Sequence, residues 1–367
     1  MKHCLPTFAL EKLSDASDQI KEKDLNINTL LKRKKTMKKI KFIVASIAVC
    51  MGITAQAQET KSAEPKGKAI VQTFGNFNAD FSKDGDSHGF ELERAYLGYE
   101  YKLDGGLSVK TVMDIGKSSD VSDLQRIAYV KNALVQWKQG KWTVNGGMIS
   151  TTQFNFQEKF WGYRYVLKSF QDLYKFGSSA DLGISAAYKA TDWLSADAII
   201  VNGEGYKKVQ KGTGLCYGLG ATLTPVKGLQ VRLYGGLNQG ATADANTLNT
   251  AAFVGYKADA FSLGAEYNYM DKAGSKQSGY SAYATVNVAD NTNLYARWDE
   301  VFAGNTVSDP LRPSGSSPLK RDSAAAIVGA QLKVNKYIKV APNVRMQMDR
   351  KAGNNTYEGY VSCYFGL

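Results

Sequence analysis

Residues 107–115 read LSVKTVMDI, and their side chains fall alternately on two faces of an extended chain. The first face carries Leu107, Val109, Thr111, Met113 and Ile115, and the second carries Ser108, Lys110, Val112 and Asp114. Residues 261–270, FSLGAEYNYM, repeat the pattern. Because successive side chains of a β-strand point to opposite sides, this period of two predicts strands with one largely apolar face.

The same alternation recurs through most of the chain after residue 68. We predict sixteen strands, at residues 69–81, 89–102, 107–115, 126–137, 141–149, 179–189, 193–202, 214–224, 229–237, 250–258, 261–270, 279–288, 292–302, 322–333, 337–349 and 356–367. Most of them are about 9 to 13 residues long, which suits a tilted strand that crosses a bilayer. No apolar run of about 20 residues follows residue 57, so the sequence excludes a bundle of membrane-spanning helices.

The connections between these strands alternate in length. Short turns such as 104–106 and 139–140 alternate with longer loops, which we place at 82–88, 116–125, 150–178, 203–213, 238–249, 271–278, 303–321 and 350–355. Short periplasmic turns and longer external loops are typical of outer-membrane barrels, and closure of the sheet satisfies every backbone polar group in hydrocarbon. The predicted fold is all-β: a transmembrane antiparallel β-barrel of about sixteen strands with a long third extracellular loop.

The N-terminal part of the chain carries an export signal. Residues 37–57 contain lysines, an apolar stretch from Ile40 to Ile53 and an Ala55-Gln56-Ala57 cleavage motif. We therefore predict an upstream extension or misassigned start at 1–36, a signal peptide at 37–57, a periplasmic linker at 58–68 and a barrel domain at 69–367. The predicted location is the bacterial outer membrane, with its lipid as a partner.

Composition removes several classes of function. The net charge is +12, but residues 1–57 hold 11 basic and 5 acidic residues, so the rest of the chain keeps 12 − 6 = +6 and gives little support for nucleic-acid binding. The chain has only two histidines, His3 and His88, and 4 cysteines. We expect no enzyme activity, no cofactor and no metal, and we interpret the Gly-x-Ser-x-Gly pattern at 85–89 as a hairpin tip because a nucleophile elbow needs a following helix.

Two local features of the strands lead to smaller predictions. Pro342 lies inside a predicted strand, where it removes a ladder hydrogen bond, and we expect a bulge there. Cys216 falls on the predicted lumen side of its strand and Cys363 on the lipid side of the last one. We expect both to be free thiols on opposite walls.

The third external loop, residues 150–178, is rich in aromatic and charged residues. Its rings are Phe154, Phe156, Phe160, Trp161, Tyr163, Tyr165, Phe170, Tyr174 and Phe176. Its charged residues are Lys159, Arg164, Lys168 and Lys175 against Glu158 and Asp172. So many rings would be a costly patch in water. The loop must either fold into the barrel, which we favour, or pack outside against a neighbouring subunit.

Lumen-facing charges follow from the alternation. The pore and constriction candidates are Lys159, Arg164 and Lys168 on the loop, and Arg94, Arg232, Arg297 and Arg345 on the wall. Rings of basic residues favour anions. On the wall, however, acidic residues on the same faces nearly equal the basic ones in number. We therefore expect at most a modest anion preference, with small hydrophilic or anionic solutes as the partners.

Several segments carry a resemblance to a known family. Residues 90–103 (FELERAYLGYEYKL), 131–138 (KNALVQWK), 156–183 (FQEKFWGYRYVLKSFQDLYKFGSSADLG) and 338–345 (IKVAPNVR) resemble the phosphate-selective porins O and P. The resemblance implies a sixteen-stranded outer-membrane barrel, usually a homotrimer, that traps anions on arginine and lysine side chains. The chain shows no matching dense arginine ladder, so the resemblance supports a porin more directly than it supports phosphate as the solute.

These observations predict an outer-membrane porin that allows passive diffusion of small hydrophilic solutes, with a modest, phosphate-like anion preference. Two alternatives stay open at the level of sequence. One is a structural or adhesive barrel without an open pore, and the other, less favoured, is a hydrolase embedded in a barrel.

Overall fold

The computed structural model describes residues 67–82, 87–116, 126–210, 212, 214–240, 245–303, 323–349 and 355–367. All of these residues belong to one compact unit, Ala63–Leu367. The predicted upstream segment 1–36, the signal peptide 37–57 and linker residues 58–66 lie outside the described residues, so those predictions remain untested.

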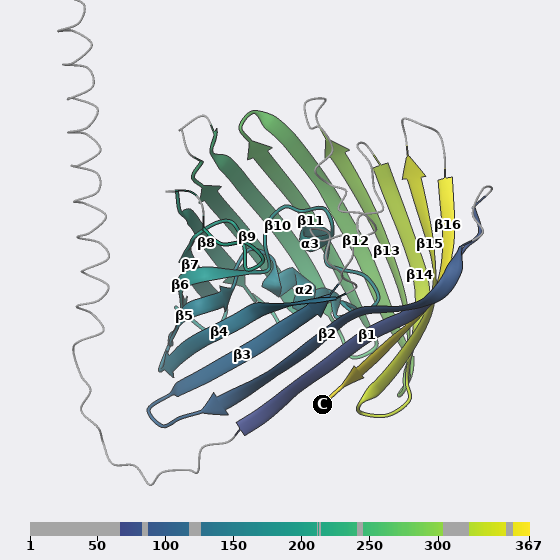
Figure 1. The fold of residues 1–367 in the computed structure, drawn as a ribbon, viewed down its shortest axis with the longest axis horizontal. Helices are drawn as coiled ribbons and strands as arrows, with labels where there is room; N and C mark the ends of the chain where they lie inside the picture. The colour runs from purple at the N-terminus through teal and green to yellow at the C-terminus, as the bar shows by residue number, and fades with distance from the viewer. Residues whose placement is uncertain are drawn as a thin grey trace, which may run out of the picture. The chain divides into compact units, whose positions relative to one another are not determined.

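The described residues form a closed antiparallel barrel of sixteen strands (Figure 1). The strands are β1 (Gly67–Asp80), β2 (His88–Lys102), β3 (Leu107–Gly116), β4 (Ile127–Gln139), β5 (Trp142–Ser150), β6 (Ala180–Lys189), β7 (Leu194–Val201), β8 (Cys216–Leu223), β9 (Leu229–Asn238), β10 (Thr247–Lys257), β11 (Phe261–Lys272), β12 (Ser275–Ala289), β13 (Thr292–Ala303), β14 (Ser323–Lys333), β15 (Ile338–Asp349) and β16 (Asn355–Gly366). Each strand pairs with its neighbours in sequence, and β1 pairs with β16 to close the sheet. The predicted fold class is confirmed.

One predicted loop is wrong. Residues 271–278 were expected to form a longer connection. Instead β11 extends to Lys272, β12 begins at Ser275, and only Ala273 and Gly274 join them. Both residues have positive φ, 53° and 82°. Such a pair matches the right-handed twist of a hairpin, so the strands remain paired up to the turn. An alanine in that conformation gives no sequence signal, because Gly is the residue usually found there.

Proline 342 does not produce the expected bulge. The pairs Gly329↔Asn343 and Leu332↔Val340 keep one register on both sides of it, and Pro342 pairs with Val361 of β16 without a shift. The ladder to β14 lacks only the pairs at Ala341 and Pro342, so the sheet tolerates the missing donor without an extra residue.

Among the described strands, bulges occur instead in β2, in β4 and, at Val288, near the end of β12. In β2, Phe74 of β1 pairs with Arg94 and Gly75 pairs with Leu92, which leaves Glu93 as an extra residue. In β4, Val112 of β3 pairs with Asn132 and Met113 with Val130, which leaves Lys131 as the extra residue. A bulge changes the direction of the side chains beside it, because two residues then oppose one.

The alternation separates an apolar outer face from an inner face. On β9, Leu233 is 52% exposed on the outer face, whereas its neighbours Arg232 and Tyr234 are buried inside the barrel. Rings gather near the short turns, where those of Trp142 and Tyr188 lie 4.6 Å apart. Aromatic rings at such positions are typical of membrane interfaces.

The two cysteines among the described residues lie where the alternation places them. Cys216 begins β8, packs beside Ile199 and Val201 of β7 and is only partly exposed. Cys363 is exposed on the outer face of β16. Both are free thiols.

The third loop folds into the barrel, as the favoured alternative predicted. It contains α2 (Asn155–Trp161) and α3 (Phe170–Leu173), which Figure 1 shows within the ring of strands. Among the described residues, no helix is long and apolar enough to cross a membrane. The loop therefore narrows the interior.

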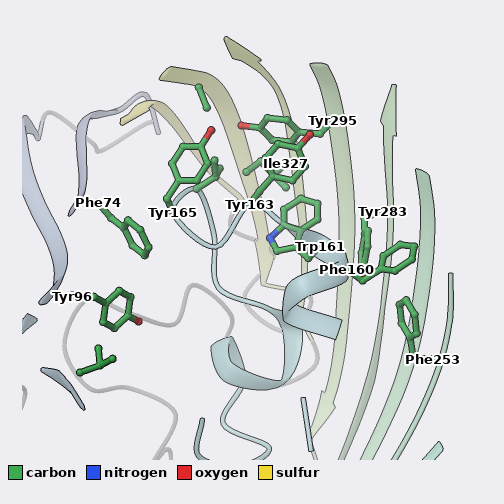
Figure 2. Close-up of a cluster of buried hydrophobic side chains, with 13 residues drawn as sticks. Phe74, Tyr96, Phe160, Trp161, Tyr163, Tyr165, Phe253, Tyr283, Tyr295 and Ile327 are labelled. Atoms are coloured by element: carbon green, nitrogen blue, oxygen red, sulfur yellow. The ribbon is translucent and has the colours of Figure 1, made fainter. Parts of the chain in front are cut away.

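The loop's rings pack against rings of the wall. Figure 2 shows Phe160 beside Phe253, and Trp161 and Tyr163 beside Tyr283 and Tyr295. The ring centroids of Tyr163 and Tyr295 are 4.5 Å apart. The inner wall thus supplies the apolar surface that the composition of the loop requires.

We predict that a charge on the outer face is not tolerated. Leu233→Arg should lower the free energy of unfolding by about 2–4 kcal/mol, because the residue is central in its strand and would place a cation in hydrocarbon. Urea titration of the barrel refolded in lipid vesicles measures the change. Gln230→Arg, on the inner face of the same strand, is the control. An equal loss in both variants would contradict the assignment of the two faces.

Candidate functional site

Three arginines of the wall hold the backbone of the loop. Arg232 donates to the carbonyl of Thr152 at 2.6 Å, Arg297 to that of Lys168 at 2.7 Å and Arg345 to that of Val166 at 2.7 Å. Backbone carbonyls enclosed in a protein need a donor, and these segments of the loop have no strand partner to supply one. The three arginines therefore anchor the loop to β9, β13 and β15.

The same arginines are engaged by other groups of the wall. Both Arg232 and Arg297 form paired bonds with a carboxylate, at 2.7 and 3.1 Å to Asp197 and at 2.7 Å twice to Asp299. Arg345 lies 3.5 Å from the centroid of the Tyr360 ring. The guanidinium charges of Arg232 and Arg297 are thus balanced behind the loop.

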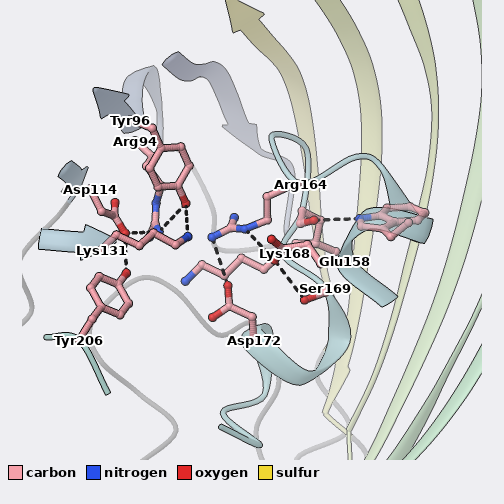
Figure 3. Close-up of polar contacts among 12 residues, drawn as sticks. Arg94, Tyr96, Asp114, Lys131, Glu158, Arg164, Lys168, Ser169, Asp172 and Tyr206 are labelled. Carbon is pink, nitrogen blue, oxygen red and sulfur yellow. Dashed lines mark hydrogen bonds and ion pairs between the residues drawn. The ribbon is translucent and has the colours of Figure 1, made fainter. Parts of the chain in front are cut away.

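The opposite side of the loop faces β2, β3 and β4, and Figure 3 shows polar side chains of the loop and of these strands directed toward one another. We call the place where they meet the gap. On this wall, Arg94 donates to Asp114 at 2.9 Å and to the Tyr96 hydroxyl at 3.2 Å. The Lys131 ammonium group donates to the same hydroxyl at 3.0 Å. The Tyr96 ring thus lies between the cations of Arg94 and Lys131, and of these two only Arg94 forms an ion pair among the described residues, with Asp114.

The loop contributes charges of its own to this gap. Arg164 lies 3.3 Å from a carboxylate oxygen of Glu158 and 3.1 Å from one of Asp172. Lys168 is half-buried and interacts electrostatically with Asp172, Arg164 and Arg94. Figure 3 places Arg164 and Lys168 toward the wall that carries Lys131.

A second connection, between β7 and β8, reaches the same place. The Tyr206 hydroxyl donates to Asp114, and the Lys207 ammonium group lies 5.0 Å from the centroid of the Tyr129 ring. Lys207 also interacts electrostatically with Lys175 of the loop. We define the basic cluster as Arg94, Lys131, Arg164, Lys168, Lys175 and Lys207. It faces Asp114, Glu158 and Asp172, so six basic groups meet three acidic ones.

Burial and like charges change the protonation of the loop residues. Burial, followed by the neighbouring cations Lys175, Arg164 and Arg94, lowers the pKa of Lys168 to about 7, although Asp172 opposes the shift. Burial raises the pKa of Asp172, but Lys168 and Arg164 lower it more, so its pKa lies below the usual range. Lys168 therefore changes charge near neutral pH while Asp172 stays ionised.

The structure separates the seven predicted site residues into three groups. Arg94, Arg164 and Lys168 meet in the basic cluster, whereas Lys159 is exposed on α2 and shares no ion pair with it. The wall arginines Arg232, Arg297 and Arg345 lie behind the loop as anchors.

Sequence reasoning missed Lys131. A strict period of two places Lys131 on the outer face, because it lies two and four residues before the outward-facing Ala133 and Val135. No residue pattern marks the bulge that turns it inward. Lys207 was missed because it lies in a connection whose path the sequence does not show. Among the described residues, no group of three or more His, Cys, Asp or Glu could hold a metal ion.

Comparison with known proteins supports the fold. No protein-family model and no curated protein matches the sequence. Solved structures do. OprB of Pseudomonas putida is 12% identical with a TM-score of 0.62, over 82% of this chain and 94% of that one. An anion-selective porin from Comamonas acidovorans is 12% identical with a TM-score of 0.61, over 83% and 100%. OmpT of Vibrio cholerae is 15% identical with a TM-score of 0.58, over 84% and 99%.

At these identities the likeness establishes a porin-like barrel fold. The finer assignment to the phosphate-selective porins O and P stays a prediction, and so does the anion preference.

The first prediction from the site concerns the anchor at Arg297. Arg297→Met should cost about 3–5 kcal/mol, because Asp299, whose side chain is 2% exposed, would lose its only guanidinium. Replacing both partners, Arg297→Met with Asp299→Leu, should recover part of that loss, while the Lys168 carbonyl and the Tyr174 hydroxyl stay without these partners. Urea unfolding of the three proteins in lipid vesicles tests this. A double variant as unstable as the single one would show that the buried pair is not the cause.

The second prediction concerns pH. The cation at Lys168 is complete below about pH 7 and lost above it, so any anion preference should fall by about two-fold between pH 5.5 and 8.5. Reversal potentials in a potassium chloride gradient measure it. Lys168→Gln should remove most of the dependence. A variant that keeps the full dependence would assign the titration to another group.

Proposed function

We propose that this protein is an outer-membrane porin through which small hydrophilic solutes diffuse passively, with a modest preference for anions. The barrel fold, the apolar outer face and the similar solved porins support the porin assignment. Export through residues 37–57, assembly as a homotrimer and contact with outer-membrane lipid belong to the same proposal. The observation that carries the anion preference is the excess of six basic over three acidic groups where the loop narrows the interior.

The position of the basic cluster gives it more influence than the rest of the wall. In a wide wet lumen, a charge is screened over about 8 Å at physiological salt. At a narrowing, an ion passes close to each charge, and the low-dielectric wall strengthens the field. The balanced pairs at Arg232 and Arg297 add little there, because each cation lies against its own carboxylate. The net charge that an ion meets is therefore that of the basic cluster.

Conductance in planar bilayers tests the proposal. The purified barrel should give ohmic single-channel currents, and a potassium chloride gradient at pH 6 should give a reversal potential of the sign that anion preference requires. Lys168→Glu should lower the chloride-to-potassium permeability ratio by about four-fold, since it changes the charge by two units close to the permeating ion. Lys159→Glu is the matched control, because it makes the same change on the same loop outside the basic cluster.

Each outcome separates the hypotheses. Absence of conductance from correctly folded, inserted barrels would favour a structural or adhesive barrel without an open pore. Conductance without anion preference would leave a porin but contradict the role of the basic cluster. An equal effect of Lys159→Glu and Lys168→Glu would show that the loop acts through its total charge and not through the residues at the gap.

A further inference from the structure

The basic residues at the gap differ in whether a carboxylate lies close to them. Arg94 and Arg164 each have a carboxylate oxygen within 3.3 Å. The ammonium groups of Lys131 and Lys168 have no carboxylate oxygen within 4.0 Å in the part of the chain that the structure describes. Asp114 therefore neutralises Arg94, and Glu158 and Asp172 neutralise Arg164. Lys168 interacts with Asp172 at longer range and forms no ion pair with a described residue, and Lys131 has the least compensated charge.

The bulge in β4 directs Lys131 toward the lumen. Lys131 is the extra residue of the β4 bulge, and the next residue, Asn132, also points inward, where it donates to Ser150 at 3.3 Å. Two successive side chains thus face the lumen, which a regular strand does not allow. The bulge places a lysine beside Tyr96 without displacing any other residue of β4 from its face.

Two rings hold the Lys131 ammonium group. It lies 4.5 Å from the centroid of the Tyr96 ring and 6.0 Å from that of Tyr206, and it donates to the Tyr96 hydroxyl at 3.0 Å. A ring face stabilises a cation without cancelling its charge. Rings therefore position this lysine, and the full charge stays available to an ion in the gap.

Arginine and lysine side chains recognise different features of an anion. A guanidinium group binds phosphate through two parallel N–H bonds, whereas an ammonium group acts as a point charge. Here Arg94 faces Asp114, and Arg164 faces Glu158 and Asp172. Binding of phosphate by either arginine would leave a half-buried or buried carboxylate without its partner, which is unfavourable.

We infer that Lys131 and Lys168 are the specificity-determining residues of the pore, and that they select small anions by charge and size and not by the geometry of a phosphate group. The inference rests on the proposed porin function and deepens it. It also runs against the phosphate preference that the family resemblance implies, because the planar donors that such a preference needs are occupied.

Four variants test the inference in planar bilayers at pH 6, where Lys168 is largely protonated. Lys131→Gln and Lys168→Gln should each lower the chloride-to-potassium permeability ratio by about two-fold. Deletion of Lys131 should match Lys131→Gln, because Val130 and Asn132 are already in register with Met113 and Val112 and would continue as a regular ladder. The matched control, Lys159→Gln, removes one exposed cation of the same loop outside the basic cluster and should leave the ratio unchanged.

A competition arm tests the solute class. Inorganic phosphate, added at a hundredth of the chloride concentration, should leave the chloride current of the wild-type pore unchanged. Block of that current would overturn the inference, since it would show a site that prefers phosphate. Loss of such a block in a double variant, Arg94→Gln with Asp114→Asn, would assign that site to the Arg94 guanidinium group.

The failures of the two proposals are distinguishable. A wild-type pore without anion preference would contradict the proposed function itself. A wild-type pore with anion preference that survives both lysine substitutions, or that loses as much of it in Lys159→Gln, would overturn the inference and leave the porin in place. Heat-modifiable electrophoretic mobility of every variant confirms that the barrel has folded.

Discussion

The structure depends on one constraint, that the backbone of a sheet in hydrocarbon must find all of its hydrogen bonds within the protein. The pairing of β1 with β16 meets this constraint for the strands, because a closed sheet has no edge. The loop inside the barrel faces the same problem without a ladder. Arg232, Arg297 and Arg345 solve it by donating to carbonyl groups of the loop. Closure and anchoring are thus two answers to one requirement.

The anchors in turn determine where charge remains available. A guanidinium group enclosed behind the loop needs a counter-charge, and Asp197 and Asp299 supply it to Arg232 and Arg297. On the other side of the loop, Asp114 and Asp172 do the same for Arg94 and Arg164. Arginine therefore serves mainly to hold the structure together here. The lysines, which are positioned by rings and by the path of the chain, are the groups whose charge an ion meets.

The aromatic composition of the loop follows from the same arrangement. Phe170, Leu173 and Tyr174 around α3 are almost completely buried, and the Tyr174 hydroxyl still donates to Asp299 at 3.1 Å. The apolar bodies of these rings fill the space between the loop and β11–β13, while their polar ends join the network of the wall. A loop packed in this way is a fixed part of the interior, so the gap that it forms has a defined set of lining residues.

The sequence by itself determined the two-faced strands, their number and most of their ends to within two residues, because a period of two along LSVKTVMDI and fifteen similar segments depends only on local chain geometry. It also indicated the inward loop, since nine rings in one connection require a surface to pack on. It could not indicate the turn at Ala273, the regular register through Pro342 or the bulge at Lys131, because each depends on how a strand pairs with its neighbour. Only the tertiary structure decided which basic residues are neutralised. Arg297 and Lys168 both appeared as pore residues in the sequence, and the closed barrel placed one against a carboxylate and the other at the gap.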